Sequence, residues 1–117
     1  NKIKEKTLNF LKNETQNGKI IYGYGASTKG NTLLQFFDLD SSIIKKISDR
    51  DSNKWNKKTV GTGIPIISEE QARKDNPDYF FILPWHLIDY FKSRENDYLK
   101  SGGKFIVPLP DFNIISE

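Results

Sequence analysis

The sequence contains no cysteine and one histidine, His86. The first absence excludes disulfides, thiol chemistry and zinc sites built on cysteines, and the second excludes a metal cluster built on several histidines. No apolar run approaches the roughly 20 residues that a membrane-spanning helix requires. The polar start, residues 1–5, also lacks the apolar segment of a secretory signal. We therefore expect a soluble, cytoplasmic domain with no metal site and no membrane contact.

The sequence also lacks a strong charge of either sign. The net charge is +3, and lysines occur singly or in pairs such as Lys45-Lys46 and Lys57-Lys58, among acidic residues. A nucleic-acid-binding domain would instead concentrate basic residues on one face, with aromatic side chains among them. We expect no nucleic-acid partner.

The length and the apolar content suit one compact domain over residues 1–117. Domains of roughly 100–150 residues are the commonest size, and 36% hydrophobic with 13% aromatic residues can form one core. The combination of low hydrophobicity and high net charge that marks disorder is absent. Because the chain starts at Asn1 and not at Met, we expect a fragment of a longer protein.

Apolar runs alternate with amphipathic segments along the chain. Residues 1–18 are expected to form an N-terminal helix that ends at Asn17-Gly18. A helix is expected to start at Ser27, with Leu33, Leu34, Phe36 and Phe37 on one side. Residues 52–63 are polar and predict a loop, and Ser68-Glu69-Glu70-Gln71 resembles a capping box. The remaining expected elements are strands at 19–22, 43–48, 64–67, 79–83 and 104–107, and a helix at 86–100 before a proline-containing tail.

Strands that alternate with helices and glycine turns favour a parallel sheet with helices on both faces. Crossovers between parallel strands are right-handed, which makes such a sheet doubly wound. The sequence therefore predicts a three-layer α/β fold with a mostly parallel, Rossmann-like sheet.

The first strand is followed by a glycine-rich turn, Gly23-Tyr24-Gly25-Ala26-Ser27-Thr28-Lys29-Gly30. Ligands of open α/β sheets bind beyond the carboxyl ends of the strands. Glycine lets the backbone approach a ligand closely, and the next helix presents free N–H groups to a phosphate. We therefore expect Gly23, Gly25, Ser27 and Lys29 to bind a nucleotide-type ligand.

Asp49 ends the second strand, where a dinucleotide-binding fold carries an acid for the ribose hydroxyls. The match to that fingerprint is incomplete, because Thr28 stands where a third glycine belongs and Gly30 comes two residues later. The spacing of a P-loop fails as well. The alternative is that the glycines only form a tight turn between strand and helix.

A second candidate loop, Pro84-Trp85-His86, leaves the most apolar strand. An indole beside an imidazole can stack on a sugar or a base, and the imidazole can act as an acid–base group. Alternatively, Trp85 packs into the core and His86 caps the next helix. No carboxylate pair or nucleophile–base pair is recognisable, so a binding module is better supported than a self-sufficient catalyst.

Four blocks of the sequence resemble the C-terminal domain of sugar C-methyltransferases, which use S-adenosylmethionine to methylate nucleotide-linked deoxysugars. The blocks stand in family order and span about residues 20–112. They are the segment from Gly23 to Gln35, the segment 61–69 (GTGIPIISE), the segment 77–86 (PDYFFILPWH) and the segment 102–110 (GGKFIVPLP).

The resemblance implies a three-part parent enzyme. A zinc-binding N-terminal part and a central methyltransferase domain, which holds the methyl donor S-adenosylmethionine and the main acid–base residues, would precede this region and are absent from this chain. The present domain would then hold the nucleotide-sugar substrate and be inactive alone. By position in the family blocks, the substrate-binding residues are Gly23, Gly25, Ser27, Lys29, Asn31, Trp85 and His86.

Two departures from the family pattern affect the site. Asp49-Arg50-Asp51-Ser52 replaces a run of the type acid-Arg-Asn, and the bulky Tyr24 between the two glycines is expected to narrow the pocket. Two alternatives to a substrate-binding domain stay open: a stand-alone nucleotide or dinucleotide-binding module without catalysis, and a docking or dimerisation module.

Overall fold

The computed structural model describes residues 2–117, and for Thr28 and Lys29 it describes the backbone alone. The elements in chain order are α1 (Lys2–Gln16), β1 (Ile21–Tyr24), α2 (Thr28–Phe36), β2 (Ile44–Asp49), the 3-10 turn η1 (Ser52–Lys54), β3 (Ile66–Ser68), α3 (Glu69–Asp75), β4 (Tyr79–Ile82), the 3-10 turn η2 (Trp85–Leu87), α4 (Ile88–Arg94), α5 (Asn96–Lys100), β5 (Lys104–Val107) and β6 (Asn113–Ile115).

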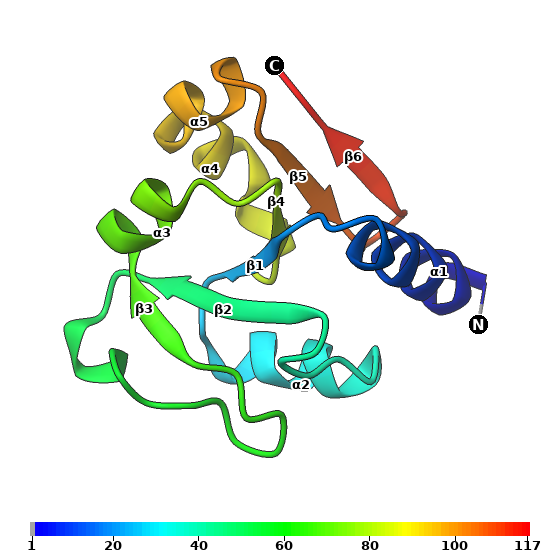
Figure 1. Cartoon of the computed structure of the whole chain (residues 1–117), viewed down its shortest axis with the longest axis horizontal. Helices are drawn as coiled ribbons and strands as arrows, with labels where there is room; N and C mark the ends of the chain where they lie inside the picture. Colours follow the sequence, from blue (N-terminus) through cyan, green and yellow to red (C-terminus); the bar gives the residue numbers. More distant parts are fainter. Residues whose placement is uncertain (1) are drawn as a thin grey trace.

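The strands form one six-stranded sheet in the order β3-β2-β1-β4-β5-β6 (Figure 1). The first five strands are parallel, and β6 runs antiparallel to β5. The expected α/β fold with a mostly parallel sheet is confirmed. Because the chain moves outward from β1 in one direction to β2 and β3, and then in the other direction to β4 and β5, the strand order reverses between β1 and β4.

Side chains of β1, β4 and β5 alternate between two apolar clusters, one on each face of the sheet. Ile21 of β1 joins Leu11 of α1 and Leu34 of α2 in the first cluster. Tyr22 and Tyr24 of the same strand join residues of α3, α4 and α5 in the second. Helices therefore cover both faces. None of the helices formed by residues 2–117 is long and apolar enough to cross a lipid bilayer.

Several expected boundaries and faces differ from the structure. β1 begins two residues later than expected and continues through Gly23 to Tyr24. The helix after Ser27 buries Leu34 and Phe37, but Phe36 is 45% exposed and does not share their buried side. The expected helix start is confirmed at Ser68, the N-cap of α3, whose hydroxyl accepts the N–H of Gln71 at 3.0 Å. The side-chain amide of Gln71 donates to Asp75 at 2.7 Å.

The single helix expected over residues 86–100 is wrong. The segment consists of η2, α4 and α5, and the backbone breaks at Glu95 (φ −104°, ψ 29°). The Glu95 side chain is only 2% exposed, because its carboxylate turns inward to bind Arg73 and Tyr24. The sequence analysis also missed β6, a three-residue edge strand that follows the proline-containing tail.

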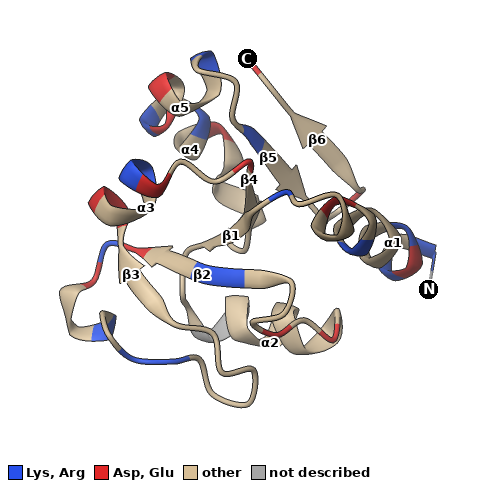
Figure 2. Cartoon of the chain, in the orientation of Figure 1, with Lys and Arg blue, Asp and Glu red and all other residues tan. Residues whose placement is uncertain are grey.

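Acidic and basic side chains alternate in short segments over the helices and loops, and β1 carries neither kind (Figure 2).

Candidate functional site

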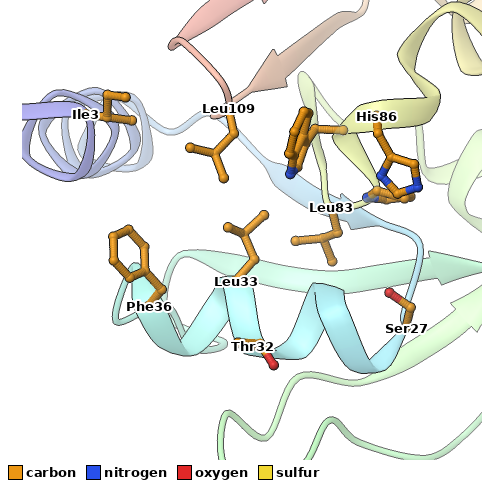
Figure 3. A pocket seen from close by; sticks show the side chains of 10 residues that line it. Ile3, Ser27, Thr32, Leu33, Phe36, Leu83, His86 and Leu109 are labelled. Carbon is orange, nitrogen blue, oxygen red and sulfur yellow. The ribbon is translucent and has the colours of Figure 1, made fainter.

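The largest described cavity, about 600 Å³, lies at the carboxyl end of β4, beside the point where the strand order reverses. In Figure 3, α2 forms one wall, and the exit of β4, Leu109 and Ile3 of α1 lie across from it. Crevices at this position are where open α/β sheets bind ligands. The lining residues are Ile3, Ser27, Thr32, Leu33, Phe36, Leu83, Pro84, Trp85, His86 and Leu109.

The cavity is predominantly apolar. Its polar side-chain groups are the hydroxyls of Ser27 and Thr32, the imidazole of His86 and the indole N–H of Trp85. No Lys, Arg, Asp or Glu is among the described lining residues. Pockets of this size with apolar walls and a few polar groups are typical of small-molecule sites. The cavity suits a ring or another uncharged part of a ligand better than a charged group.

Trp85 and His86 both lie in η2, directly after β4. Their rings stand nearly perpendicular, at 87° with centroids 6.0 Å apart. Trp85 is partly buried against the cluster under α4, while His86 is exposed. Of the residues predicted from the sequence, the structure thus brings Ser27, Trp85 and His86 to one cavity. The exposed imidazole can donate or accept a hydrogen bond there.

Ser27 is the N-cap of α2, and its hydroxyl accepts the N–H of Gly30 at 3.0 Å. Gly30 lets this helix approach the sheet closely, because a Cβ there would stand 3.0 Å from Leu83 Cβ. It thus takes the packing role of the third glycine in a nucleotide-binding fingerprint, although its spacing differs. Ser27 also lines the cavity.

The two glycines of the turn have different positions. Gly25 has φ 89°, and a Cβ there would stand 2.9 Å from Pro84 Cδ, so this residue joins the exits of β1 and β4. Gly23 lies inside β1, where a Cβ would stand 3.0 Å from Ile47 Cγ1. Gly23 lines none of the described cavities near the site, and its role there is to let β1 pack against β2.

Asp49 does not present a free carboxylate to a ribose. One oxygen accepts the N–H of Ala26 at 2.6 Å, and the other accepts the N–H of Asp51 at 2.8 Å. Lys54 Nζ lies 3.8 Å from the same carboxylate and donates to the carbonyl of Ala26 at 2.6 Å. Asp49 therefore binds the N–H of Ala26 and Lys54 binds its carbonyl, and together they fix the glycine turn at this residue.

Asn31 turns away from the main cavity. Its amide donates to the carbonyl of Val60 at 2.9 Å and accepts from the Thr62 hydroxyl at 3.2 Å. It lines a smaller hollow of about 190 Å³ between α2 and the loop 58–60. The side chain of Lys29, also predicted to bind substrate, lies outside the described residues.

Tyr24 does not narrow the cavity, because its ring points to the opposite face of the sheet and its hydroxyl donates to Glu95 at 2.7 Å. Burial raises the pKa of Tyr24 far above its usual value, and the bond to Glu95 adds to the effect. Burial alone would raise the pKa of Glu95. The Arg73 guanidinium, 2.7–2.9 Å away, and the Tyr24 hydroxyl instead hold this pKa below its usual value.

Sequence reasoning missed the apolar half of the cavity and the lysine that fixes the turn. Leu33, Phe36 and Leu109 resemble ordinary core positions in the sequence, and Ile3 lies far from the glycine turn along the chain. Lys54 belongs to no recognisable sequence motif. The only signal that could have pointed to it is its position shortly after the end of β2.

Two comparisons with known proteins bear on this site. Residues 1–110 match the family model described as the C-methyltransferase C-terminal domain. The C-methyltransferase NovU of Streptomyces niveus is 36% identical over 115 residues, which are 98% of this chain and 27% of that protein. The chain therefore spans about a quarter of the length of the curated relative that it matches.

Proposed function

Because the chain belongs to the C-methyltransferase C-terminal domain family, we propose that it is the substrate-binding part of an S-adenosylmethionine-dependent C-methyltransferase acting on a nucleotide-linked sugar. The observation that carries this proposal is the apolar cavity of about 600 Å³ at the carboxyl end of β4. In this proposal the methyl transfer itself requires the parts of the longer protein outside this domain.

The cavity offers uncharged contacts to the ligand. The Trp85 indole supplies an aromatic face on which a planar or sugar ring can stack. Ser27 and His86 supply hydrogen bonds at the rim, and Gly25 keeps the turn close to Pro84. These side chains orient a substrate, and none of them forms a nucleophile–base pair, so the domain acts by positioning.

S-adenosylmethionine is the methyl donor that the family implies. The groups at the glycine turn that would hold its adenosine do not fit that role, because Asp49 is bonded to Ala26 and Asp51, and the N–H of Ala26 is already taken. We therefore propose that the donor binds elsewhere in the longer protein.

The same engagement of Asp49 weighs against the alternative of a stand-alone dinucleotide-binding module, which needs this carboxylate for a ribose. We assign the domain a doubly wound, Rossmann-like architecture, supported by the reversal of strand order between β1 and β4. In this assignment the sheet serves as a platform for a nucleotide-sugar.

A calorimetric titration of this chain with dTDP, S-adenosylmethionine and NAD tests the proposal. We expect saturable heat with dTDP alone. A Trp85→Ala variant should lose most of this heat, whereas a Trp55→Ala variant should keep it because Trp55 does not line the cavity. Binding of NAD or of S-adenosylmethionine in place of dTDP would contradict the proposal.

A further inference from the structure

Another hollow, of about 110 Å³, lies at the carboxyl ends of β1 and β2, on the α4 side of the sheet. It is separate from both the apolar cavity and the hollow beside Asn31. Its volume is well above the roughly 10–15 Å³ that a single water needs. It is distinct from the apolar cavity, since Gly25 lines this hollow and Pro84 lines the other. The lining residues are Tyr24, Gly25, Ser48, Asp49, Arg50, Glu69, Phe91 and Arg94.

Arg94 reaches this hollow from the end of α4 with donor capacity to spare. Its Nη2 donates to Glu69 at 2.6 Å, and its guanidinium lies 5.7 Å from the centre of the Tyr90 ring. Its Nη1 is buried and has no hydrogen-bond partner among the described residues. A buried guanidinium nitrogen without an acceptor is unusual and calls for a partner. The side chain remains 22% exposed, so it is not sealed from a ligand.

Arg50 approaches the same hollow from the end of β2. It is exposed, and its hydrogen bond is a long one of 3.5 Å to the neutral hydroxyl of Tyr90. It forms no ion pair with any described residue, whereas Arg94 is paired with Glu69. Acidic and basic segments meet where β2 ends (Figure 2).

The carboxylates around the hollow are already used. Asp49 is bound by backbone N–H groups and Lys54, and Glu69 by Arg94 and Arg73. The lining residues carry two cations and two carboxylates. Their ion-pair partners Lys54 and Arg73, together with Glu95, which pairs with Arg73, bring the total to four cations and three carboxylates, so one positive charge is in excess. The cations are Arg50, Lys54, Arg73 and Arg94, and the carboxylates are Asp49, Glu69 and Glu95. The unpaired cation is Arg50.

We propose that Arg50 and Arg94 form a second binding site, which takes a phosphate group in the hollow beside Gly25. Guanidinium groups match phosphate oxygens with paired N–H donors. A phosphate would replace the weak contact of Arg50 with Tyr90, and it would give Arg94 Nη1 an acceptor once the guanidinium turns toward it. The phosphate comes either from a free ion or from a nucleotide whose remainder lies in the apolar cavity across Gly25 and Pro84. In the second case the inference rests on the function proposed above.

Titration with sodium pyrophosphate at low salt, followed by amide chemical shifts, tests the site itself. The wild-type chain should show saturable shifts at Gly25 and Arg50. Arg50→Met should weaken pyrophosphate binding by about tenfold or more, the loss expected for one charge-assisted hydrogen bond. Lys57→Met is the matched control, since it removes an exposed lysine that lies outside the hollow, and it should change the affinity less than about twofold.

Equal weakening in Arg50→Met and Lys57→Met, or no saturable shift in the wild type, would overturn the proposal. Arg94→Met risks unfolding because it removes the 2.6 Å partner of Glu69 and leaves only Arg73 at 3.7 Å, so Arg94→Lys is the second variant. Arg94→Lys keeps the charge and loses the planar fork, and it should also weaken pyrophosphate binding. Unchanged binding in this variant, with an unchanged unfolding midpoint, would exclude Arg94 from the site.

A parallel titration with dTDP separates the two sources of phosphate. If one nucleotide spans both sites, Arg50→Met and Trp85→Ala should each weaken the binding of dTDP. Trp85→Ala should leave the affinity for pyrophosphate unchanged. If the site takes a free ion, Arg50→Met should weaken the binding of pyrophosphate and leave the affinity for dTDP unchanged. Pyrophosphate binding that depends on Arg50 without any dTDP binding would contradict the proposed function and leave this site standing.

Discussion

Gly25 is the residue on which the geometry of the turn depends most directly. It combines a left-handed backbone, φ 89°, with a contact so close that a Cβ would stand 2.9 Å from the ring of Pro84. A side chain at this position therefore meets two separate penalties, one from the backbone and one from the neighbour. The two penalties can be separated because Gly18 has the left-handed backbone and no close neighbour.

Gly25→Ala should lower the free energy of unfolding by about 1–2 kcal/mol for the left-handed backbone and by about 1–3 kcal/mol more for the clash with Pro84. Gly18→Ala is the control, because Gly18 has φ 85° and no neighbouring atom within 4 Å of the Cβ position. Urea unfolding of both variants measures the difference. Equal losses would mean that Pro84 yields without cost.

The Asp49 carboxylate binds the backbone N–H groups of Ala26 and Asp51, so its removal should lower the free energy of unfolding. Asp49→Ala should cost about 1.5–3 kcal/mol, as expected for a charge-assisted bond to Ala26. Asp51→Ala removes an exposed carboxylate that caps only the 3-10 turn η1, and should cost about 1 kcal/mol or less. Chemical denaturation distinguishes the two. An Asp49→Ala chain as stable as the wild type would restore Asp49 as a candidate ligand group.

At the scale of elements, the strands were predictable where apolar runs are bounded by glycine or proline, as for β4 before Pro84 and β5 after Gly103. The break at Glu95 was not predictable from local pattern, since it arises from contacts with Arg73 on α3 and Tyr24 on β1. β6 was missed because three residues at a sheet edge give too short an alternation to recognise.

The site shows the same division. Ser27, Trp85 and His86 could be placed together in advance, because the carboxyl ends of parallel strands share one edge of the sheet. Their contact with a ligand stays a prediction. The contact of Lys54 with Asp49 and Ala26 and the turning of Asn31 toward Val60 depend on loop residues 54–62, whose fold carries no sequence signal.

The packing of α4 and α5 against the sheet should depend on pH through Glu95. Its folded-state pKa lies below the usual value of about 4.3, so its ionised form stabilises the fold fully above that pH. The contribution is lost as the pH falls through the lower folded-state pKa. Glu95→Gln should therefore be less stable than the wild type at pH 7, and the gap should shrink below pH of about 4. A constant gap across unfolding experiments from pH 7 to pH 3 would contradict this.

At the scale of the whole molecule, the domain has an apolar cavity on one side of the Gly25–Pro84 contact and, on the other, a hollow lined by two arginines, Arg50 and Arg94, and two carboxylates, Asp49 and Glu69. Its relative NovU is nearly four times as long as the matched region, because that region makes up 27% of NovU. We expect this chain alone to transfer no methyl group from S-adenosylmethionine to a dTDP-linked deoxysugar. Methylated product in a mass-spectrometric assay of the purified chain would contradict a purely binding role.

The two tryptophans of the chain, Trp55 and Trp85, allow the location of the nucleotide to be tested directly. In Trp55→Phe, Trp85 is the sole indole and lines the cavity. In Trp85→Phe, the remaining Trp55 donates to the Asp49 carbonyl outside it. Titration with dTDP should change the fluorescence of Trp55→Phe saturably and leave Trp85→Phe unchanged. A response confined to the Trp55 indole, or none in either variant, would contradict nucleotide binding at this cavity.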